Sequence, residues 1–202
     1  MLKLNDGDII LASASPRRQE LLKLLDIPFK VIPSDVDETD MEARKPIDLV
    51  LHLAQKKAEL ISKANPTAWV LGADTIVVLG EDIISKPTSK QDAVAMIRKL
   101  SNATHTVFTG FAIINQINQI KHTEVVASKV TFRRISDDEI LWYVSTRESY
   151  DKAGGYALQG KGSVFVVAVD GSPSNVVGLP MSEVFFRLKE LGAINFSGED
   201  NE

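Results

Sequence analysis

Apolar residues along the chain follow two periods in turn, and this alternation predicts strands separated by helices. Apolar runs with the length of a buried strand occur at Ile9–Ala12 and at Phe29–Ile32, where Pro33 stops the second run. From Pro46 onwards, apolar residues recur at spacings of three and four up to Ile61, which is the pattern of one buried helix face. Strands are expected over 9–12, 29–32, 69–71, 76–79, 106–114, 124–132 and 164–169, and helices over 16–25, 46–61, 90–100, 137–144 and 180–191.

Three of the expected helices carry start signals. Ser15 stands in the N-cap position before a proline at the first helical position. Ser89 with Asp92, and Ser136 with Glu139, have the spacing of a capping box, in which side chain and backbone exchange hydrogen bonds. These signals favour helices at the predicted positions over other readings of the same apolar residues.

Strands that alternate with helices predict an α/β fold. A long hairpin over 106–132 makes the expected sheet mixed rather than purely parallel. The chain has no internal repeat and no linker rich enough to divide it, so residues 1–194 are expected to form a single domain. The polar residues 195–202 are expected to be a frayed tail.

Composition narrows the class of protein. The 202 residues carry a net charge of −4, which argues against a protein that binds duplex DNA through bulk charge. Cysteine is absent, which excludes disulfides, thiolate nucleophiles and zinc–thiolate sites and suits a cytoplasmic protein. The start of the chain lacks the long apolar run of a signal peptide, and polar residues interrupt the uncharged stretch 100–120, so no membrane span is expected.

The segment between the first expected strand and helix has the chemistry of an anion site. Ser13, Arg17 and Arg18 lie where a helix N-terminus presents unpaired backbone N–H groups. Hydroxyl groups and guanidinium forks match phosphate oxygens. A capped surface helix with two solvated arginines is the alternative that spacing alone leaves open.

Asp74 differs from the other acidic residues. Asp35, Asp37, Glu38 and Asp40 crowd one loop, where a run of charges is usually solvated. Asp74 instead lies between two apolar runs, and buried carboxylates are rare unless they are paired or bound to metal. An oxygen ligand of this kind suits Mg²⁺ or Mn²⁺ in a phosphate site, and a helix or turn cap is the alternative.

Other polar residues give weaker signals. Lys57 is placed on the polar side of the long helix, and Lys86 precedes a capped helix; either lysine can offset phosphate charge, but each alone is more often a surface residue. The three histidines lack metal-ligand spacing and receive no role. In the glycine-rich stretch 151–160, the Gln159 amide can read a base edge, and a flexible loop is the alternative.

Six segments, taken together and in order, resemble the Maf-type nucleoside triphosphate pyrophosphatases. They extend over residues 9–190, nearly the whole chain. One such segment is a weak signal, whereas six in family order are a specific one. The segments are Leu11-Ala12-Ser13-Ala14-Ser15-Pro16-Arg17-Arg18, Val36-Asp37-Glu38, Leu71-Gly72-Ala73-Asp74-Thr75, Lys86-Pro87, Asp151-Lys152-Ala153-Gly154 with Gln159-Gly160, and Asn175-Val176-Val177-Gly178-Leu179-Pro180.

The resemblance implies hydrolysis between the α- and β-phosphates of a nucleotide, which releases a monophosphate and pyrophosphate. It also implies the fold of the inosine triphosphate pyrophosphatases, an elongated mixed α/β body with a cleft between two lobes. Within the family the chain resembles the dTTP/UTP branch, because Arg17, Thr75 and Gln159 stand at that branch's specificity positions. The branch that prefers 7-methylguanosine triphosphate tends to have Ser-Asp-Gln where this chain has Ala73-Asp74-Thr75.

The same resemblance implies roles for single residues. Asp74 is the expected proton acceptor and, with Glu38, an expected ligand of a divalent cation, Mg²⁺ or Mn²⁺. Thr75 and Gln159 are expected to read the pyrimidine. The remaining expected substrate-binding residues contact phosphate, and they are Ser13, Arg17, Arg18, Lys57 and Lys86.

Partners and alternative functions follow from the resemblance too. The expected partner is a nucleoside triphosphate, without a stable nucleic-acid complex and without a membrane, and a homodimer is left open. Members of the family are linked to septum formation and division arrest, so a non-catalytic nucleotide-binding regulator is one alternative. The branch that prefers 7-methylguanosine triphosphate is another.

Overall fold

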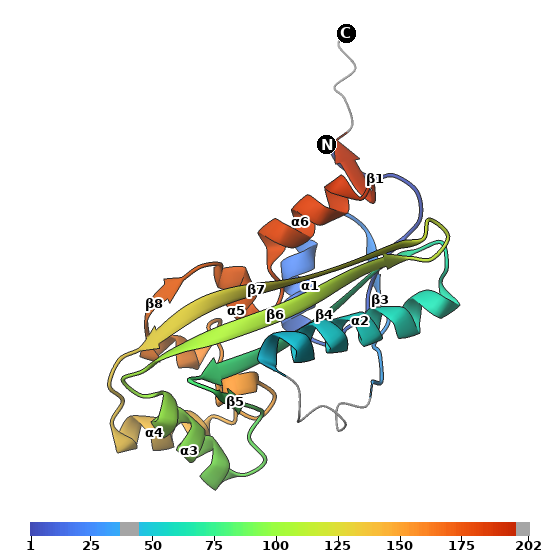
Figure 1. The fold of residues 1–202 in the computed structure, drawn as a ribbon. Coiled ribbons are helices and arrows are strands. Elements are labelled where there is room, and N and C mark those ends of the chain that lie inside the picture. Colours follow the sequence, from blue (N-terminus) through green and yellow to red (C-terminus); the bar gives the residue numbers. More distant parts are fainter. Residues whose placement is uncertain (37–44, 197–202) are drawn as a thin grey trace. The chain divides into compact units, whose positions relative to one another are not determined.

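The computed structural model of the chain describes residues 1–36 and 45–196. These residues form two compact units, each assembled from separate stretches of sequence (Figure 1). Unit 1 comprises Met1–Asp74, Gly110–Val125 and Gly178–Glu202, and unit 2 comprises Thr75–Thr109 and Val126–Val177. No helix among the described residues has both the length and the apolar character needed to cross a lipid bilayer.

The expected strands and helices occur in the expected order, except that the strands expected at 69–71 and 76–79 are one strand. The strands are β1 (Leu2–Leu4), β2 (Ile9–Leu11), β3 (Phe29–Val31), β4 (Trp69–Leu79), β5 (Asp82–Ile84), β6 (Thr104–Asn115), β7 (Ile120–Phe132), β8 (Val166–Asp170) and β9 (Ile194–Phe196). The α-helices are α1 (Pro16–Lys23), α2 (Pro46–Ala64), α3 (Lys90–Leu100), α4 (Asp137–Ser145), α5 (Pro173–Val177) and α6 (Met181–Glu190). The 3₁₀ helix η2 (Ala153–Gly155) lies in the glycine-rich stretch 151–160, and the 3₁₀ helix η3 (Lys161–Phe165) directly follows it.

The main sheet is mixed, as the sequence predicts. Its strand order is β3-β2-β4-β6-β7-β8, with β5 paired to β4 outside this path. Strand β2 pairs in parallel with both β3 and β4, whereas β4 with β5 and β7 with β8 are antiparallel. The chain is therefore a mixed α/β protein with helices on its sheet, which confirms the expected fold class.

Strand β4 corrects one expectation. The sequence predicts two strands around residues 72–75, but β4 runs without interruption from Trp69 to Leu79. Asp74 lies inside this strand and is buried, so a charged residue does not end it. A buried carboxylate is tolerated in a strand when a partner of opposite charge offsets it, and Asp74 has such a partner.

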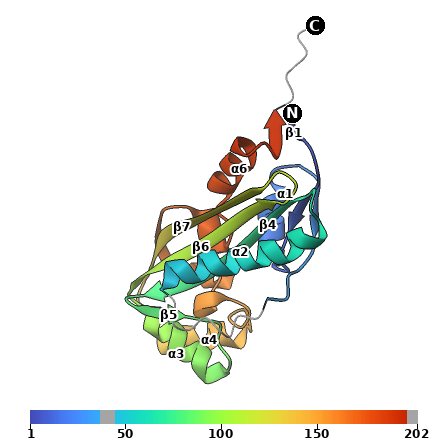
Figure 2. The ribbon, with the colours of Figure 1, turned by 45° about the vertical axis from the view of Figure 1, so that its right-hand side comes forward.

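Helix α2 packs its apolar face on strands β4 and β6 in unit 1 (Figure 2). Its alanines Ala54 and Ala58 are fully buried with Val70 of β4 and Ala112 of β6. Small side chains on the helix allow its axis to lie close to the sheet, which determines how deep a long side chain from α2 reaches.

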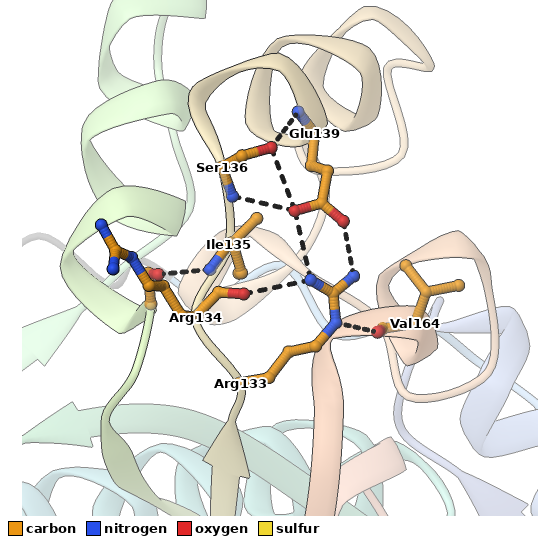
Figure 3. Close-up of polar contacts among 7 residues, drawn as sticks. Arg133, Arg134, Ile135, Ser136, Glu139 and Val164 are labelled. Carbon is orange, nitrogen blue, oxygen red and sulfur yellow. Dashed lines mark hydrogen bonds and ion pairs between the residues drawn. The ribbon is translucent and has the colours of Figure 1, made fainter.

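Helix α4 in unit 2 begins with the capping box that the sequence predicts (Figure 3). The Ser136 hydroxyl accepts from the Glu139 backbone N–H at 3.3 Å, and the Glu139 carboxylate accepts from the Ser136 N–H at 2.8 Å. The Arg133 guanidinium donates to both Glu139 oxygens, at 3.1 and 2.7 Å, and its Nε donates to the Val164 carbonyl at 3.1 Å. The hydrogen bonds from Arg133 and Ser136 lower the pKa of Glu139 to about 2.

Three features near the ends of elements differ from expectation. Strand β9 pairs antiparallel with β1, so Asn195 and Phe196 are not part of a frayed tail. Helix α5 occupies the stretch after the turn at 170–173, where no helix is expected. Ser15 holds the N-cap position of α1, but its side chain makes no capping hydrogen bond. Propensity does not predict β1, β9 or α5, because each is short and depends on tertiary contacts.

Candidate functional site

The turn from β2 into α1 is held together by side chains of the expected phosphate site. The Ser13 hydroxyl accepts from Nη1 of Arg18 at 3.1 Å and from the backbone N–H of Ser15 at 3.3 Å. Nε of Arg18 donates to the Gly178 carbonyl at 2.8 Å. Arg18 therefore ties the start of α1 to the segment that precedes α6, and both lie in unit 1. Arg17 is half-buried on the same turn of α1.

Gly72 determines how closely α2 approaches β4. A Cβ atom at Gly72 would lie 2.4 Å from the Ala54 carbonyl oxygen and 2.8 Å from the Ala58 nitrogen. No side chain fits between the strand and the helix backbone at this point. Residues two apart on a strand face the same side, so Asp74 faces α2 as Gly72 does.

Lys57 and Asp74 meet at this close approach. Nζ of Lys57 donates to Oδ1 of Asp74 at 2.7 Å, and the two side chains are 11% and 13% exposed. The expectation that Lys57 lies on the polar side of α2 is wrong. Lys57 lies three residues after Ala54 and four before Ile61, and this spacing carries it onto the buried face. Each charge offsets the other, which makes burial of both tolerable.

Of the two expected metal ligands, Asp74 is the one that the structure describes. Glu38, the other expected ligand, lies outside the described residues. Within residues 1–36 and 45–196, no group of three or more histidine, aspartate or glutamate side chains is arranged to hold a metal. Mg²⁺ commonly takes one or two protein carboxylates and completes its shell with water and phosphate oxygens. Asp74 can supply such a carboxylate.

Three of the expected site residues lie in unit 2. Oγ1 of Thr75 lies 2.9 Å from Oγ1 of Thr109, so a hydroxyl on β6 holds the Thr75 hydroxyl on β4. Lys86 and Gln159 are exposed. The Gly154 N–H donates to the Ser85 carbonyl at 3.1 Å, which joins the strand-end segment of Lys86 to the glycine-rich stretch that carries Gln159.

The glycine-rich stretch is anchored at its ends and is not a loose loop. Oε2 of Glu148 accepts from the Lys161 N–H at 2.9 Å, and Oε1 accepts from the Gly162 N–H at 3.1 Å and from the Tyr143 hydroxyl at 3.2 Å. A Cβ at Gly160 would lie 2.6 Å from this carboxylate, so a larger residue beside Gln159 requires the Glu148 side chain to shift. Glu148 thus fixes the position of the backbone that follows Gln159.

A buried histidine anchors the middle of the same stretch. Nε2 of His105 lies 2.7 Å from the hydroxyl of Tyr156, and both rings pack edge-on against Phe132. His105 is 1% exposed, and burial lowers its pKa to about 4. His105 therefore belongs to the core of unit 2, which agrees with its lack of metal-ligand spacing.

Sequence reasoning missed several residues that position the site. Glu148 and His105 gave no signal, because each acts on a segment distant in sequence. Thr109 lies in an expected strand, and the hydrophobic pattern of that strand gives it no special role. Asn175 begins the last of the six segments that resemble the Maf-type family, but the sequence alone assigned it no role.

Comparisons with known proteins agree with this picture. The family model of the Maf-like protein family matches residues 8–191. A protein of Syntrophus aciditrophicus (strain SB) named dTTP/UTP pyrophosphatase is 48% identical over 194 residues, covering 96% of this chain and 95% of its own. A protein of the same name from Myxococcus xanthus (strain DK1622) is 46% identical over 184 residues, covering 91% and 92%.

A solved structure shows the same fold at low identity. A HAM1 protein from Coxiella burnetii covers 91% of this chain and 99% of its own, with a TM-score of 0.50 and 13% identity. The fold therefore defines a mixed α/β protein whose fold is shared with this HAM1 protein. Since the family model covers nearly the whole chain, the chain belongs to the Maf-like protein family.

Proposed function

We propose that this protein is a nucleoside triphosphate pyrophosphatase that hydrolyses dTTP and UTP to the monophosphate and pyrophosphate. The buried ion pair of Lys57 and Asp74 carries the proposal, since a carboxylate held inside a strand suits a general base. The relatives named dTTP/UTP pyrophosphatase, 46–48% identical over more than nine-tenths of the chain, support the substrate.

In this reaction a water molecule attacks the α-phosphorus, and the bond from that phosphorus to the oxygen that bridges it to the β-phosphorus breaks. Asp74 orients the water and accepts its proton. Lys57 holds the Asp74 carboxylate in place and offsets its charge. Arg18, fixed by Ser13 and Gly178, presents a guanidinium to the phosphates at the start of α1 together with Arg17.

Three of the proposed substrate-binding residues, Thr75, Lys86 and Gln159, belong to unit 2. Thr75 and Gln159 read the pyrimidine, and Lys86 offsets phosphate charge from its exposed position beside Pro87. A divalent cation, Mg²⁺ or Mn²⁺, bound by Asp74 and Glu38 would offset the negative charge of the phosphates. The bond from the Lys161 N–H to Glu148 anchors the backbone that follows Gln159, the proposed reading residue.

A matched pair of variants tests the site. Asp74→Asn keeps the shape of the side chain but removes the proton acceptor, so pyrophosphate release from UTP should fall by about 10²–10⁴. Asp82→Asn is the control, because Asp82 is an exposed residue of unit 2 that pairs with Lys99. Both variants should keep the far-ultraviolet circular dichroism spectrum of the wild type. Near-normal turnover by a folded Asp74→Asn variant would refute the assigned role.

A further inference from the structure

Glu148 accepts hydrogen bonds from both ends of the glycine-rich stretch that carries Gln159. At the start of the stretch, Nζ of Lys152 donates to the Glu148 backbone carbonyl at 2.7 Å. Directly after the stretch, the backbone N–H groups of Lys161 and Gly162 donate to the Glu148 carboxylate at 2.9 and 3.1 Å. All of these residues belong to unit 2. The stretch therefore leaves one residue and returns to it, as the chain does in an Ω-loop, whose ends lie close together.

The core of unit 2 holds the Glu148 carboxylate in place. The hydroxyl of Tyr143 donates to Oε1 of Glu148 at 3.2 Å. Tyr143 is fully buried, and its ring packs edge-on against Phe165 with 5.2 Å between the ring centroids. The Glu148 backbone N–H donates to Oγ1 of Thr146 at 3.4 Å, at the end of α4. The carboxylate is thus attached to a packed helix on one side and to the stretch on the other.

The two backbone groups that Glu148 binds explain why a carboxylate suits this position. Lys161 and Gly162 are the first two residues of η3, and the first N–H groups of a helix have no partner inside it. An ionised carboxylate only accepts and has two oxygens, so it satisfies both N–H groups at once. Hydrogen bonds to an ionised acceptor are also stronger than those between neutral groups.

Gln159 depends on its backbone for a fixed position. The residue is exposed, so packing gives its side chain little support. The residue that follows it is Gly160, and a glycine has more backbone freedom than any other residue. The carbonyl of Gly160 accepts from the hydroxyl of Ser163 at 2.6 Å and from its N–H at 3.1 Å. Together with the bonds from Glu148 to the next two residues, these contacts remove the freedom of the backbone beside Gln159.

We infer that Glu148 is a positioning residue of the proposed enzyme, whose carboxylate holds Gln159 ready for the nucleotide and does not touch the nucleotide itself. A contact residue that is already ordered loses less entropy when the ligand binds, which raises affinity. The inference rests on the proposed pyrophosphatase function. It extends that function to a residue outside the six segments that resemble the Maf-type family.

The isosteric change Glu148→Gln tests this role. The amide keeps one acceptor oxygen and replaces the other with a donor, so it cannot accept from both N–H groups. The KM for UTP should rise about five- to tenfold, the size of one hydrogen bond. The kcat should stay within about twofold of the wild type, because a contact made equally with substrate and transition state affects KM alone. Glu124→Gln, on a glutamate of unit 1 that accepts from Arg187 at 2.7 Å, is the control and should leave KM unchanged.

A double-mutant cycle with Gln159→Ala separates positioning from general damage to the fold. If Glu148 acts through Gln159, adding Glu148→Gln to Gln159→Ala should raise the KM for UTP no further. A structural role alone would multiply the two effects and lower kcat as well. An unchanged KM in Glu148→Gln, or effects that multiply, overturns the inference while the pyrophosphatase function stands.

Two measurements keep the test decisive if Glu148→Gln does not fold. Gly160→Ala places a Cβ atom 2.6 Å from Oε1 of Glu148, so it displaces the carboxylate and should raise the KM for UTP in the wild type but not in Gln159→Ala. In the wild type, the amide of the exposed Lys161 should exchange its hydrogen at least about tenfold more slowly than in an unfolded chain. An unprotected Lys161 amide, or an unchanged KM in Gly160→Ala, contradicts the inference. Absence of pyrophosphate from every nucleotide with the wild type refutes instead the proposed function.

Discussion

At the residue scale, the ion pair of Lys57 and Asp74 affects both the stability of the fold and the proposed catalytic step. Both side chains are largely buried, at 11% and 13% exposed, so neither is well solvated without the other. Removal of one partner leaves an uncompensated buried charge, whereas removal of both leaves none. Asp74, the proposed base, therefore depends on Lys57 in two ways. Lys57 makes the burial of Asp74 in β4 tolerable, and it supplies the neighbouring charge.

A double-mutant cycle measures this dependence. Lys57→Met should lower the free energy of unfolding by about 3 kcal/mol, and the added change Asp74→Leu should recover a part of that loss. The coupling energy should exceed that of Lys99 and Asp82, an ion pair whose side chains are 46% and 67% exposed and whose coupling should be about 0.5 kcal/mol. Denaturant titration of the variants gives both numbers, and equal coupling in the two pairs would contradict the buried pairing.

His105 makes the stability of the protein depend on acid. Burial lowers its pKa from 6.5 to about 4, so below pH 6.5 the unfolded chain takes up a proton that the folded protein does not. Stability should be complete above pH 6.5 and decline by about 3 kcal/mol as the pH falls toward 4.

His105→Gln tests this pH dependence. Denaturant unfolding between pH 7 and pH 4.5 should show a shallower decline for this variant than for the wild type, because a glutamine does not titrate. Tyr156→Phe is the control, since it removes the hydrogen-bond partner but keeps the histidine, and its decline should stay steep. An equally steep decline in His105→Gln would assign the acid sensitivity to other groups.

At the element scale, the close approach of α2 to β4 sets the geometry of the candidate site. Gly72→Ala places a Cβ atom 2.4 Å from the Ala54 carbonyl oxygen, so the helix must move away from the strand. The variant should lose about 2–3 kcal/mol of stability and also activity, because Lys57 moves with the helix.

A second glycine provides the comparison for this prediction. Gly192 has a φ of +86° and no atom within 4 Å of an added Cβ, so Gly192→Ala should cost about 1 kcal/mol from backbone strain alone. Its turnover should stay at the wild-type level. Thermal unfolding and pyrophosphate assays on both variants separate the two effects. Equal losses of stability and turnover in Gly72→Ala and Gly192→Ala would show that the close approach of α2 to β4 does not set the geometry of the site.

Elements with local signals were predictable from the sequence, and those that depend on distant contacts were not. The capping box of Ser136 and Glu139 lies within one turn, and α4 begins where that box predicts. The burial of Lys57 depends on an aspartate 17 residues further along, and the pairing of β9 with β1 joins the two ends of the described chain. Apolar patterning also divided β4 at Asp74, because a pattern of residue types does not show that a lysine on another element offsets the charge.

The candidate site follows the same rule. Asp74 was singled out because its position inside an apolar run is a local signal, and the structure buries it beside Lys57. The residues that hold the other candidates, such as Glu148 and Thr109, act across folded contacts and carry no local mark.

At the scale of the whole molecule, the proposed residues fall in both compact units. Asp74 ends the first segment of unit 1, and Thr75, the next residue, begins unit 2. The proposed proton acceptor and the proposed base reader are thus neighbours on strand β4.

The identity of the products formed from UTP tests the central claim most directly. The purified protein with Mg²⁺ should convert UTP to UMP and pyrophosphate in equal amounts, and in water labelled with oxygen-18 the label should appear in UMP, since water attacks the α-phosphorus. dTTP should behave in the same way, and ATP and GTP should yield little product. Release of orthophosphate and UDP as the first products, or label in pyrophosphate alone, would contradict the account.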